Sequence, residues 1–426
     1  MDMFIVKGGN RLSGKIKPAG NKNEALPVLA AILLTDQPIT LHNLPVIGDI
    51  KKMKAILEKL GVTISFKGES SYQFDSSVLV SSEPDKNLSE SIRGSFLLAV
   101  PLLYRFHTAK IYIPGGDSIG RRRLDTHLTG LEKLGVKVQK EQDHFLVTLK
   151  GGFKGSDIIL DEASVMATEH LIMAAVVAEG TTTIYNAACE PHVQGLCHML
   201  NGMGACIEGI GSNFLKFKGV SSLKGFEHRI QPDHTEVGSI IGLAATTKSE
   251  ITIEDPGFHN LGQILNYFER LGVKTKISGK DLIIPAKQNL MIKNDVDQSI
   301  PKIDDAPWPG FPADLTSIMT VVATQCNGTV LIFEKMFESR LFWVDKLISM
   351  GARIILCDPH RAVVVGPSKL RGTVLTSPDI RAGMALLIAA LCADGVSEIH
   401  NIHQIDRGYE RIDERLRLLG ADIQRL

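Results

Sequence analysis

The segment LEKLGVKV, residues 131–138, is one of six similar copies in this chain of 426 residues. The other five copies read LEKLGVTI (57–64), LNGMGACI (200–207), FERLGVKT (268–275), LISMGARI (347–354) and LRLLGADI (416–423). In each copy an amphipathic stretch ends at a glycine and an alternating stretch follows, which is typical of a helix, its C-terminal glycine and a strand. Because the glycines follow one another at intervals of about 70 residues, the sequence predicts six repeated units.

A second pattern recurs between these copies, as in AILLTDQPITLHNLP (31–45) and AAVVAEGTTTIYNAA (174–188). Here an apolar helix breaks at a turn, and a strand rich in β-branched residues follows. Each unit is therefore predicted to contain a helix, a turn, a strand, a second helix, a glycine and a further strand. Six such units indicate two similar domains of three units each. The alternative is an ordinary α/β protein with chance repeats, and the even spacing argues against it.

Composition excludes several classes of protein. The 47 basic residues balance the 47 acidic ones, so nothing predicts binding to nucleic acid or to an anionic membrane surface. The longest apolar runs have about ten residues, whereas a bilayer span needs about 20. The start of the chain lacks the features of a signal peptide. The six cysteines include no C-x-x-C pair, and CEPHVQGLCH (189–198) fits no standard zinc spacing. We expect a cytoplasmic protein without a metal site.

The segment IPGGDSIGRRRLDTH, residues 113–127, combines glycines with three consecutive arginines. Its G-x-x-x-x-G spacing resembles a P-loop, but the required Lys-Ser/Thr pair is absent, which excludes that assignment. A glycine-rich loop of this kind can close over a substrate. Asp117 is unexpected here, since its carboxylate would repel a phosphate.

Several cationic residues are candidates for anion binding. Lys22 and Asn23 lie in a turn before a predicted helix, where free N–H groups favour anions, although a solvated turn lysine is the alternative. Asp314 lies in a proline-rich segment and could be an ordinary helix N-cap. The guanidinium groups of arginine suit carboxylates and phosphates. The arginines considered for such a cluster are Arg93, Arg122, Arg340, Arg381 and Arg407.

These segments together resemble the enolpyruvyl transferase family along essentially the whole chain. The resemblance is carried by KNEALP (22–27), GG-x-x-IG-x-R-x-x-D-x-H (115–127), FPADL (311–315), FESR (337–340) and IDRGYERI (405–412). It implies an α/β fold of two domains, each an inside-out barrel of three units. The implied domains are residues 1–20 with 232–426, and residues 21–231, the second carrying a mobile loop at 113–127.

The resemblance also implies a reaction and a set of site residues. The reaction is the transfer of enolpyruvyl from phosphoenolpyruvate to the 3-hydroxyl of UDP-N-acetylglucosamine, an early step of peptidoglycan synthesis that needs no cofactor. The implied catalytic residues are Lys22, Asp117, Asp314 (the base) and Arg407. The residues implied to bind phosphoenolpyruvate are Lys22, Asn23, Arg122, Arg340, Arg381 and Arg407. Those implied to bind the sugar nucleotide are Asn23, Arg93, Arg122, Arg123, Leu124, Asp125, Thr126, Ser164, Val165, Asp314 and Met336, with Glu190 near the nucleotide pocket.

The chain departs from the family pattern at a few of these positions. Glu162 replaces a commonly basic residue, Arg123 a proline and Met166 a glycine, which affects the expected uridine contacts. Asp117 stands where better-known members have a cysteine that is alkylated by fosfomycin, so we predict a fosfomycin-insensitive enzyme with Asp117 as proton donor. The alternatives are a shikimate-pathway enolpyruvyl transferase and a catalytically inactive binding protein. The expected partners are small-molecule substrates, and the sequence leaves the oligomeric state open.

Overall fold

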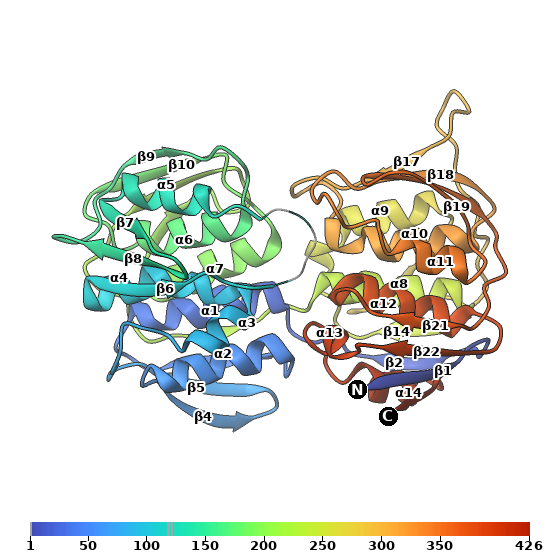
Figure 1. The fold of residues 1–426 in the computed structure, drawn as a ribbon, viewed down its shortest axis with the longest axis horizontal. Coiled ribbons are helices and arrows are strands. Elements are labelled where there is room, and N and C mark those ends of the chain that lie inside the picture. The colour runs from blue at the N-terminus through green and yellow to red at the C-terminus, as the bar shows by residue number, and fades with distance from the viewer. Residues whose placement is uncertain (1, 117–119, 121) are drawn as a thin grey trace. The chain divides into compact units, whose positions relative to one another are not determined.

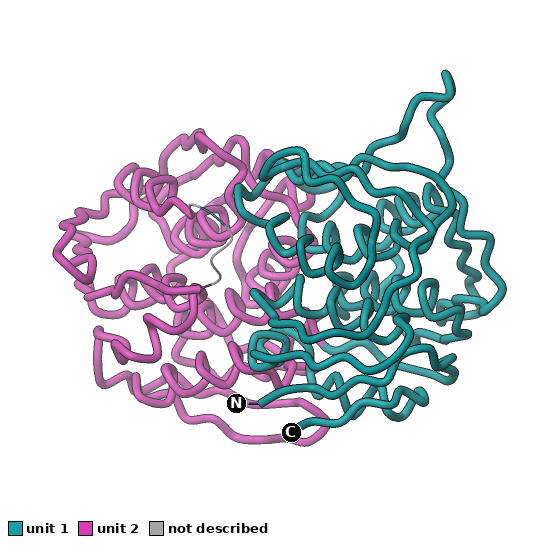
Figure 2. Tube along the Cα trace, turned by 45° about the vertical axis from the view of Figure 1, so that its right-hand side comes forward, with its two compact units in different colours: residues 1–19, 117–121, 232–426 teal, residues 20–116, 122–231 magenta. Residues whose placement is uncertain are grey.

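The computed structural model describes residues 2–116, 120 and 122–426. The chain forms two compact units, shown in Figures 1 and 2. Unit 1 contains the described residues of 1–19, 117–121 and 232–426, and unit 2 contains residues 20–116 and 122–231. Each unit has its own core of buried apolar side chains. The Asp117 prediction lies outside the described residues.

The described part of unit 1 contains three four-stranded sheets. The first has the order β21 (Val374–Thr376), β22 (Val396–His400), β1 (Met3–Lys7) and β23 (Asp422–Arg425). The second has the order β15 (Lys276–Ser278), β16 (Asp281–Ile284), β14 (Glu250–Ile253) and β2 (Ser13–Ile16). The third has the order β17 (Lys302–Asp304), β18 (Gly328–Phe333), β20 (Arg361–Gly366) and β19 (Arg353–Asp358).

Unit 2, as far as it is described, also contains three sheets. One has the order β11 (Cys206–Glu208), β12 (Phe214–Lys218), β10 (Thr181–Tyr185) and β9 (Asp157–Ile159). Another has the order β13 (Glu227–Arg229), β3 (Ile39–His42), β5 (Ser71–Asp75) and β4 (Thr63–Gly68). The last is three-stranded, with the order β6 (Thr108–Tyr112), β8 (His144–Leu149) and β7 (Val136–Lys140).

All the four-stranded sheets share one topology. One edge strand pairs in parallel with its neighbour, as β9 does with β10, and the other two pairings are antiparallel. A parallel pair needs a crossover connection. In three of these sheets a helix between the two strands supplies it, as α6 (Val165–Ala175) does between β9 and β10. The repeat predicted from the sequence is therefore confirmed as a unit of alternating strands and helices.

One helix of each repeat lies in the interior of its unit and is largely buried. In α12 (Ile380–Cys392), every residue from Ile380 to Leu391 is buried. A helix that is apolar on all sides belongs in an interior, and Figure 1 shows the helices enclosed by the sheets. The other interior helices are α8 (His234–Thr246) and α10 (Thr316–Gln325) in unit 1, and α1 (Lys22–Ala31), α4 (Ala99–Phe106) and α6 (Val165–Ala175) in unit 2. This α/β fold with interior helices is the predicted one.

A second set of helices is amphipathic and precedes the six repeated glycines. These helices are α2 (Gly48–Lys59), α5 (Asp125–Lys133), α7 (Pro191–Gly202), α9 (Gly262–Arg270), α11 (Val344–Ser349) and α14 (Ile412–Leu418). The glycines that follow them are Gly61, Gly135, Gly204, Gly272, Gly351 and Gly420, and all have positive φ. Only glycine adopts this left-handed backbone without strain, which explains its place between helix and strand.

The two crossings between the units exchange strands between the repeat that contains α1 and the repeat that contains α8. Strand β2 precedes α1 in the chain but pairs in parallel with β14, which follows α8. Conversely, β13 precedes α8 but pairs with β3, which follows α1. Helices α1 and α8 therefore begin at equivalent points of the two units.

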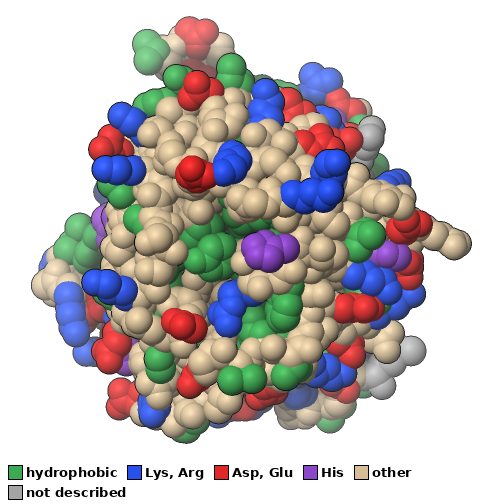
Figure 3. Space-filling model, turned by 90° about the vertical axis from the view of Figure 1, so that its left-hand side faces the viewer, with side chains coloured by type: hydrophobic (Ala, Val, Ile, Leu, Met, Phe, Trp, Pro, Cys, Tyr) green, Lys and Arg blue, Asp and Glu red, His purple; other side chains and the backbone are tan. Residues whose placement is uncertain are grey.

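The surface carries both signs of charge. On the face shown in Figure 3, basic and acidic side chains are interspersed rather than gathered into one patch. No helix within the described ranges is long and apolar enough to cross a membrane.

Candidate functional site

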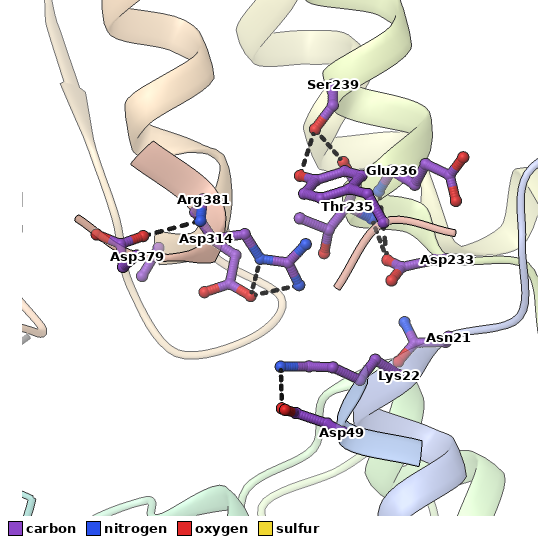
Figure 4. Close-up of polar contacts among 12 residues, drawn as sticks. Asn21, Lys22, Asp49, Asp233, Thr235, Glu236, Ser239, Asp314, Asp379 and Arg381 are labelled. Carbon is purple, nitrogen blue, oxygen red and sulfur yellow. Dashed lines mark hydrogen bonds and ion pairs between the residues drawn. The ribbon is translucent and has the colours of Figure 1, made fainter. Parts of the chain in front are cut away.

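Asp314 is the centre of a charged network in unit 1 (Figure 4). It lies in η4 (Ala313–Leu315), the short helical turn before α10. Its Oδ1 accepts a hydrogen bond from Nη1 of Arg340 at 3.0 Å, and its Oδ2 accepts one from Nε of Arg381 at 2.9 Å. Nη2 of Arg381 also lies 2.9 Å from Oδ2 as an ion pair. Both arginine side chains are almost fully buried. Two guanidinium groups thus share one carboxylate.

The simpler interpretation of Asp314, as a helix N-cap, is wrong. The cap of η4 is Pro312 and the cap of α10 is Leu315, and neither helix has a side-chain cap. Because the Asp314 oxygens bond to arginines instead, the residue has a different function from closing a helix end.

Arg381 is held in place by the start of α12. Asp379, which precedes this helix, accepts hydrogen bonds from the backbone N–H groups of Arg381 at 2.8 Å and Ala382 at 2.9 Å. This N-cap fixes the first turn of the helix. The Arg381 guanidinium also lies over the ring of Tyr409, at 5.5 Å from its centroid. Asp379 is not among the candidates predicted from sequence, although an acid just before a helix is a recognisable cap signal.

The two arginines have donors left over. Nε of Arg340 and Nη1 of Arg381 are buried and have no hydrogen-bond partner in the structure, as far as it is described. A buried donor without a partner costs about 1–3 kcal/mol, and more when it is charged. An anionic ligand would satisfy these donors, so this part of unit 1 is suited to binding a second carboxylate or a phosphate.

The Met336 backbone is fixed by a buried acid. Asp305 accepts hydrogen bonds from the N–H groups of Lys335, at 2.5 Å, and Met336, at 3.2 Å. With its N–H already bonded, Met336 offers a ligand its carbonyl oxygen. Nearby, burial raises the pKa of Glu334 to about 9. Neither Asp305 nor Glu334 was a candidate from sequence, because nothing local distinguishes them.

Arg407 lies at the end of α13 (His403–Asp406). Its Nη1 donates a hydrogen bond to Oε1 of Gln404 at 2.8 Å. Its assignment as a phosphate-binding residue stays a prediction.

In unit 2, Lys22 is the first residue of α1. Its Nζ lies 3.5 Å from Oδ2 of Asp49, the second residue of α2, and both side chains are largely buried. Asn21 caps the helix by accepting a hydrogen bond from the N–H of Glu24. Lys22 is therefore a positioned side chain at a helix start rather than a solvated one, whereas Asn23 follows it half-buried.

Arg93 and Arg122 lie close together. Arg93 begins η2 (Arg93–Leu98), and its Nη2 donates hydrogen bonds to the carbonyl oxygens of Arg122 and Arg123 at 3.1 and 3.2 Å. Burial and the charge of Arg122 lower the pKa of Arg93 to about 10. A Cβ added at Gly116 would lie 3.3 Å from Cβ of Arg93. The φ of Gly116 is 131°, a backbone conformation that would be strained for any residue with a side chain. The loop end and the two arginines thus form one cationic group.

The segment after Arg122 is tied to the segment before α6. Nη1 of Arg123 lies 3.1 Å from Oδ2 of Asp161, and Oγ1 of Thr126 donates a hydrogen bond to Oδ1 of the same acid at 2.7 Å. Arg123 also lies 3.4 Å from Asp125, and Glu162 accepts a weaker bond from Thr126. The structure therefore brings these candidate residues of unit 2 together, while Leu124 caps α5 by its backbone alone.

Ser164 and Val165 form the start of α6. Ser164 is the N-cap by position, but its hydroxyl makes no capping hydrogen bond. Unbonded N–H groups of a first helical turn favour an anion. Further along α6, burial and the charge of Glu190 raise the pKa of Glu169 well above its usual range. The described residues include no group of three or more His, Cys, Asp or Glu side chains able to hold a metal ion.

Comparison with known proteins identifies the class of enzyme that this fold and these arginines define. The family model for EPSP synthase (3-phosphoshikimate 1-carboxyvinyltransferase) matches residues 6–416, so the chain belongs to this family of enolpyruvyl transferases. Within the family, it is similar to proteins named UDP-N-acetylglucosamine 1-carboxyvinyltransferase. It is 52% identical to that of Bradyrhizobium diazoefficiens, over 99% of this chain and 98% of the relative. It is also 52% identical to that of Bacteroides thetaiotaomicron, over the whole of both chains.

Solved structures show the same fold. The enolpyruvyl transferase NikO from Streptomyces tendae superimposes with a TM-score of 0.89 at 24% identity, covering 100% of this chain and 98% of the other. EPSP synthase from Acinetobacter baumannii superimposes with a TM-score of 0.77 at 16% identity, covering the whole of both chains. The fold predicted from the repeats is thereby confirmed.

Proposed function

We propose that this protein transfers the enolpyruvyl group of phosphoenolpyruvate to the 3-hydroxyl of UDP-N-acetylglucosamine and releases phosphate. The full-length relatives support this acceptor, because they carry its name at 52% identity. The observation that carries the chemistry is the Asp314 network, in which a potential base is bonded to two buried arginines. The product would be a precursor of peptidoglycan. Since both substrates are cytoplasmic metabolites, a cytoplasmic location is part of the proposal.

The addition step needs a base and a proton donor. The sugar oxygen forms a bond to C2 of phosphoenolpyruvate, its proton passes to Asp314, and C3 takes a proton from Asp117. In the elimination, the bond from C2 to the phosphate oxygen breaks, the Asp117 carboxylate takes a proton back from C3, and phosphate leaves with the proton that Asp314 held. Fixed cations stabilise the charge that develops on these groups.

The arginines would divide between the two anionic groups of phosphoenolpyruvate. Arg340 and Arg381 have the unbonded buried donors that would receive its carboxylate. Lys22, Arg122 and Arg407 would receive its phosphate. In unit 2, the residues proposed to bind the sugar nucleotide are Asn23, Arg93, Arg122, Arg123, Leu124, Asp125, Thr126, Ser164 and Val165. The unit 1 residues proposed to bind it are Asp314 and Met336.

Phosphate release tests the acceptor. With phosphoenolpyruvate present, we expect phosphate when UDP-N-acetylglucosamine is added and none with shikimate 3-phosphate. Shikimate 3-phosphate is the specific rival because the matching family model is named for its transferase. Phosphate release with shikimate 3-phosphate but not with UDP-N-acetylglucosamine would overturn the proposal in favour of the rival transferase. No phosphate release with either acceptor would indicate an inactive homologue.

A further inference from the structure

Two buried histidines of unit 2 are bonded to each other. His127 lies on α5 and His170 lies on α6, and both side chains are almost completely inaccessible to solvent. Their Nδ1 atoms are 2.9 Å apart. Nε2 of His170 lies 2.7 Å from the backbone oxygen of Phe96, which belongs to η2. The chain of bonds therefore joins three separate elements.

The chemistry of these atoms sets the direction of each bond. A backbone carbonyl oxygen only accepts, so Nε2 of His170 carries a hydrogen. Burial lowers the pKa of His170 to about 4, so near neutral pH its other nitrogen, Nδ1, is bare and accepts. His127 must then donate from Nδ1, with its Nε2 bare. Each imidazole has one tautomer compatible with the structure.

The three joined elements carry the sugar-nucleotide candidates of unit 2 other than Asn23. Arg93 begins η2, three residues before Phe96. The segment from Arg122 to Thr126 runs into the first turn of α5, and His127 is the residue after Thr126. Ser164 and Val165 begin α6. The imidazole pair thus links the three elements on which, or just before which, these proposed ligand contacts lie.

The packing around the pair leaves little freedom. The ring of Phe96 lies 5.3 Å, centroid to centroid, from each imidazole. One turn along α5, a Cβ added to Gly130 would lie 2.7 Å from Cδ1 of Leu171 on α6. The two helices are therefore in close contact, and the hydrogen bond between the histidines determines how α5 is set along α6.

We propose that the His127–His170 pair is a positioning device for the sugar nucleotide, holding η2, α5 and α6 at the spacing that their ligand contacts need. This inference rests on the proposed function. The pair touches no ligand itself, so losing the bond should weaken binding of one substrate without changing the chemical step. The residues are positioning residues rather than catalytic ones.

Substitutions at His127 separate the bond from the bulk of the side chain. His127→Leu removes the donor, and we expect KM for UDP-N-acetylglucosamine to rise by about tenfold, the equivalent of one buried hydrogen bond. His127→Asn places an amide N–H where Nδ1 was, so KM should stay within about threefold of the unaltered protein. In both variants kcat and KM for phosphoenolpyruvate should change by less than about twofold.

Val147→Ala is the control for lost packing. Val147 lies on β8 and is buried in the same core. Its apolar side chain cannot make a hydrogen bond to η2, α5 or α6. The substitution should lower thermal stability as the Leu variant does and leave KM unchanged. The inference is overturned if His127→Leu leaves the KM for the sugar nucleotide unchanged, if the Asn variant loses as much as the Leu variant, or if the control raises KM equally.

The tautomers give a test that needs no variant. Nitrogen-15 spectra of the histidines in the intact protein should show His127 protonated at Nδ1 and His170 at Nε2. The opposite tautomers would refute the hydrogen-bonded pair, whichever acceptor substrate the enzyme uses. If the unaltered protein does not use UDP-N-acetylglucosamine at all, the proposed function fails, and that result is distinct from any difference among the variants.

Discussion

Nε and Nη2 of Arg381 both lie 2.9 Å from Oδ2 of Asp314, so one guanidinium group makes a hydrogen bond and an ion-pair contact to the same carboxylate oxygen (Figure 4). The other oxygen, Oδ1, bonds Arg340, so charge-assisted contacts from two arginines hold both oxygens of this carboxylate. In the proposed reaction the same arginines receive the carboxylate of phosphoenolpyruvate. The proposed base and the proposed carboxylate receptor are therefore coupled.

This coupling predicts the behaviour of Asp314→Asn. The amide keeps the shape of the side chain but cannot take a proton from the sugar hydroxyl, so kcat should fall by at least about 100-fold. Affinity for UDP-N-acetylglucosamine should stay within about tenfold. Steady-state kinetics and calorimetric titration measure the two effects.

Asp304→Asn is the matched control for that substitution. Asp304 lies in the same segment and pairs with Lys302 and Lys335, and its own side chain is mostly buried. Its neutralisation should leave kcat within about twofold, because its ion pairs are with lysines and not with the arginines that hold Asp314. An unchanged kcat in Asp314→Asn would remove that residue from the mechanism.

Asp379→Ala should weaken binding of phosphoenolpyruvate. Without this N-cap, the first turn of α12 frays and Arg381 is no longer held, at a cost of about 1 kcal/mol in stability. We expect KM for phosphoenolpyruvate to rise about fivefold. Asp85→Ala removes the N-cap of α3 (Lys86–Ser91) in unit 2, and should lower stability without this change in KM. Equal KM values in the two variants would contradict the prediction.

Glu334 should make stability depend on pH. Burial raises its pKa from 4.5 to about 9, so the unfolded chain releases a proton that the folded chain keeps. The free energy of unfolding should therefore fall as pH rises from about 4.5 towards 9, by about 4 kcal/mol at pH 7.5. Glu334→Gln has no such proton, so its stability advantage should grow over that range. If the free energy of unfolding changes equally with pH in the two proteins from pH 5 to 8.5, Glu334 is not the source of the pH dependence.

Asp117 predicts resistance to fosfomycin. A free aspartic acid has a pKa of about 3.9, so acting as a proton donor near pH 7 needs an environment that disfavours its charge. A carboxylate is a much weaker nucleophile than a thiolate toward an epoxide. The unaltered enzyme should therefore show no time-dependent inactivation by fosfomycin.

Two substitutions of Asp117 extend this prediction. Asp117→Asn should nearly abolish turnover, because the amide cannot donate the proton. Asp117→Cys should keep activity and acquire time-dependent inhibition. Turnover in the presence of fosfomycin measures both, and an active Asn variant would rule out Asp117 as the proton donor.

The sequence alone determined the repeating architecture and many of the site candidates. Each repeat has three local patterns: a helical period of apolar residues, a glycine such as Gly135, and an alternating strand. These patterns depend only on residues that are neighbours in the sequence. The differences from the family pattern at Glu162 and Arg123 could also be identified from sequence, because both residues lie inside recognisable segments. Asp379 was readable in principle as a helix cap, since that signal is local too.

Tertiary structure alone decided which side chains meet. Asp314 looked like a helix cap until Arg340 and Arg381, which lie 26 and 67 residues away, were found on its oxygens. His127 and His170 are 43 residues apart and carry no mark of their pairing. Such partners are set by how buried helices pack, because removing water from a polar group requires a bond that only the folded chain can supply.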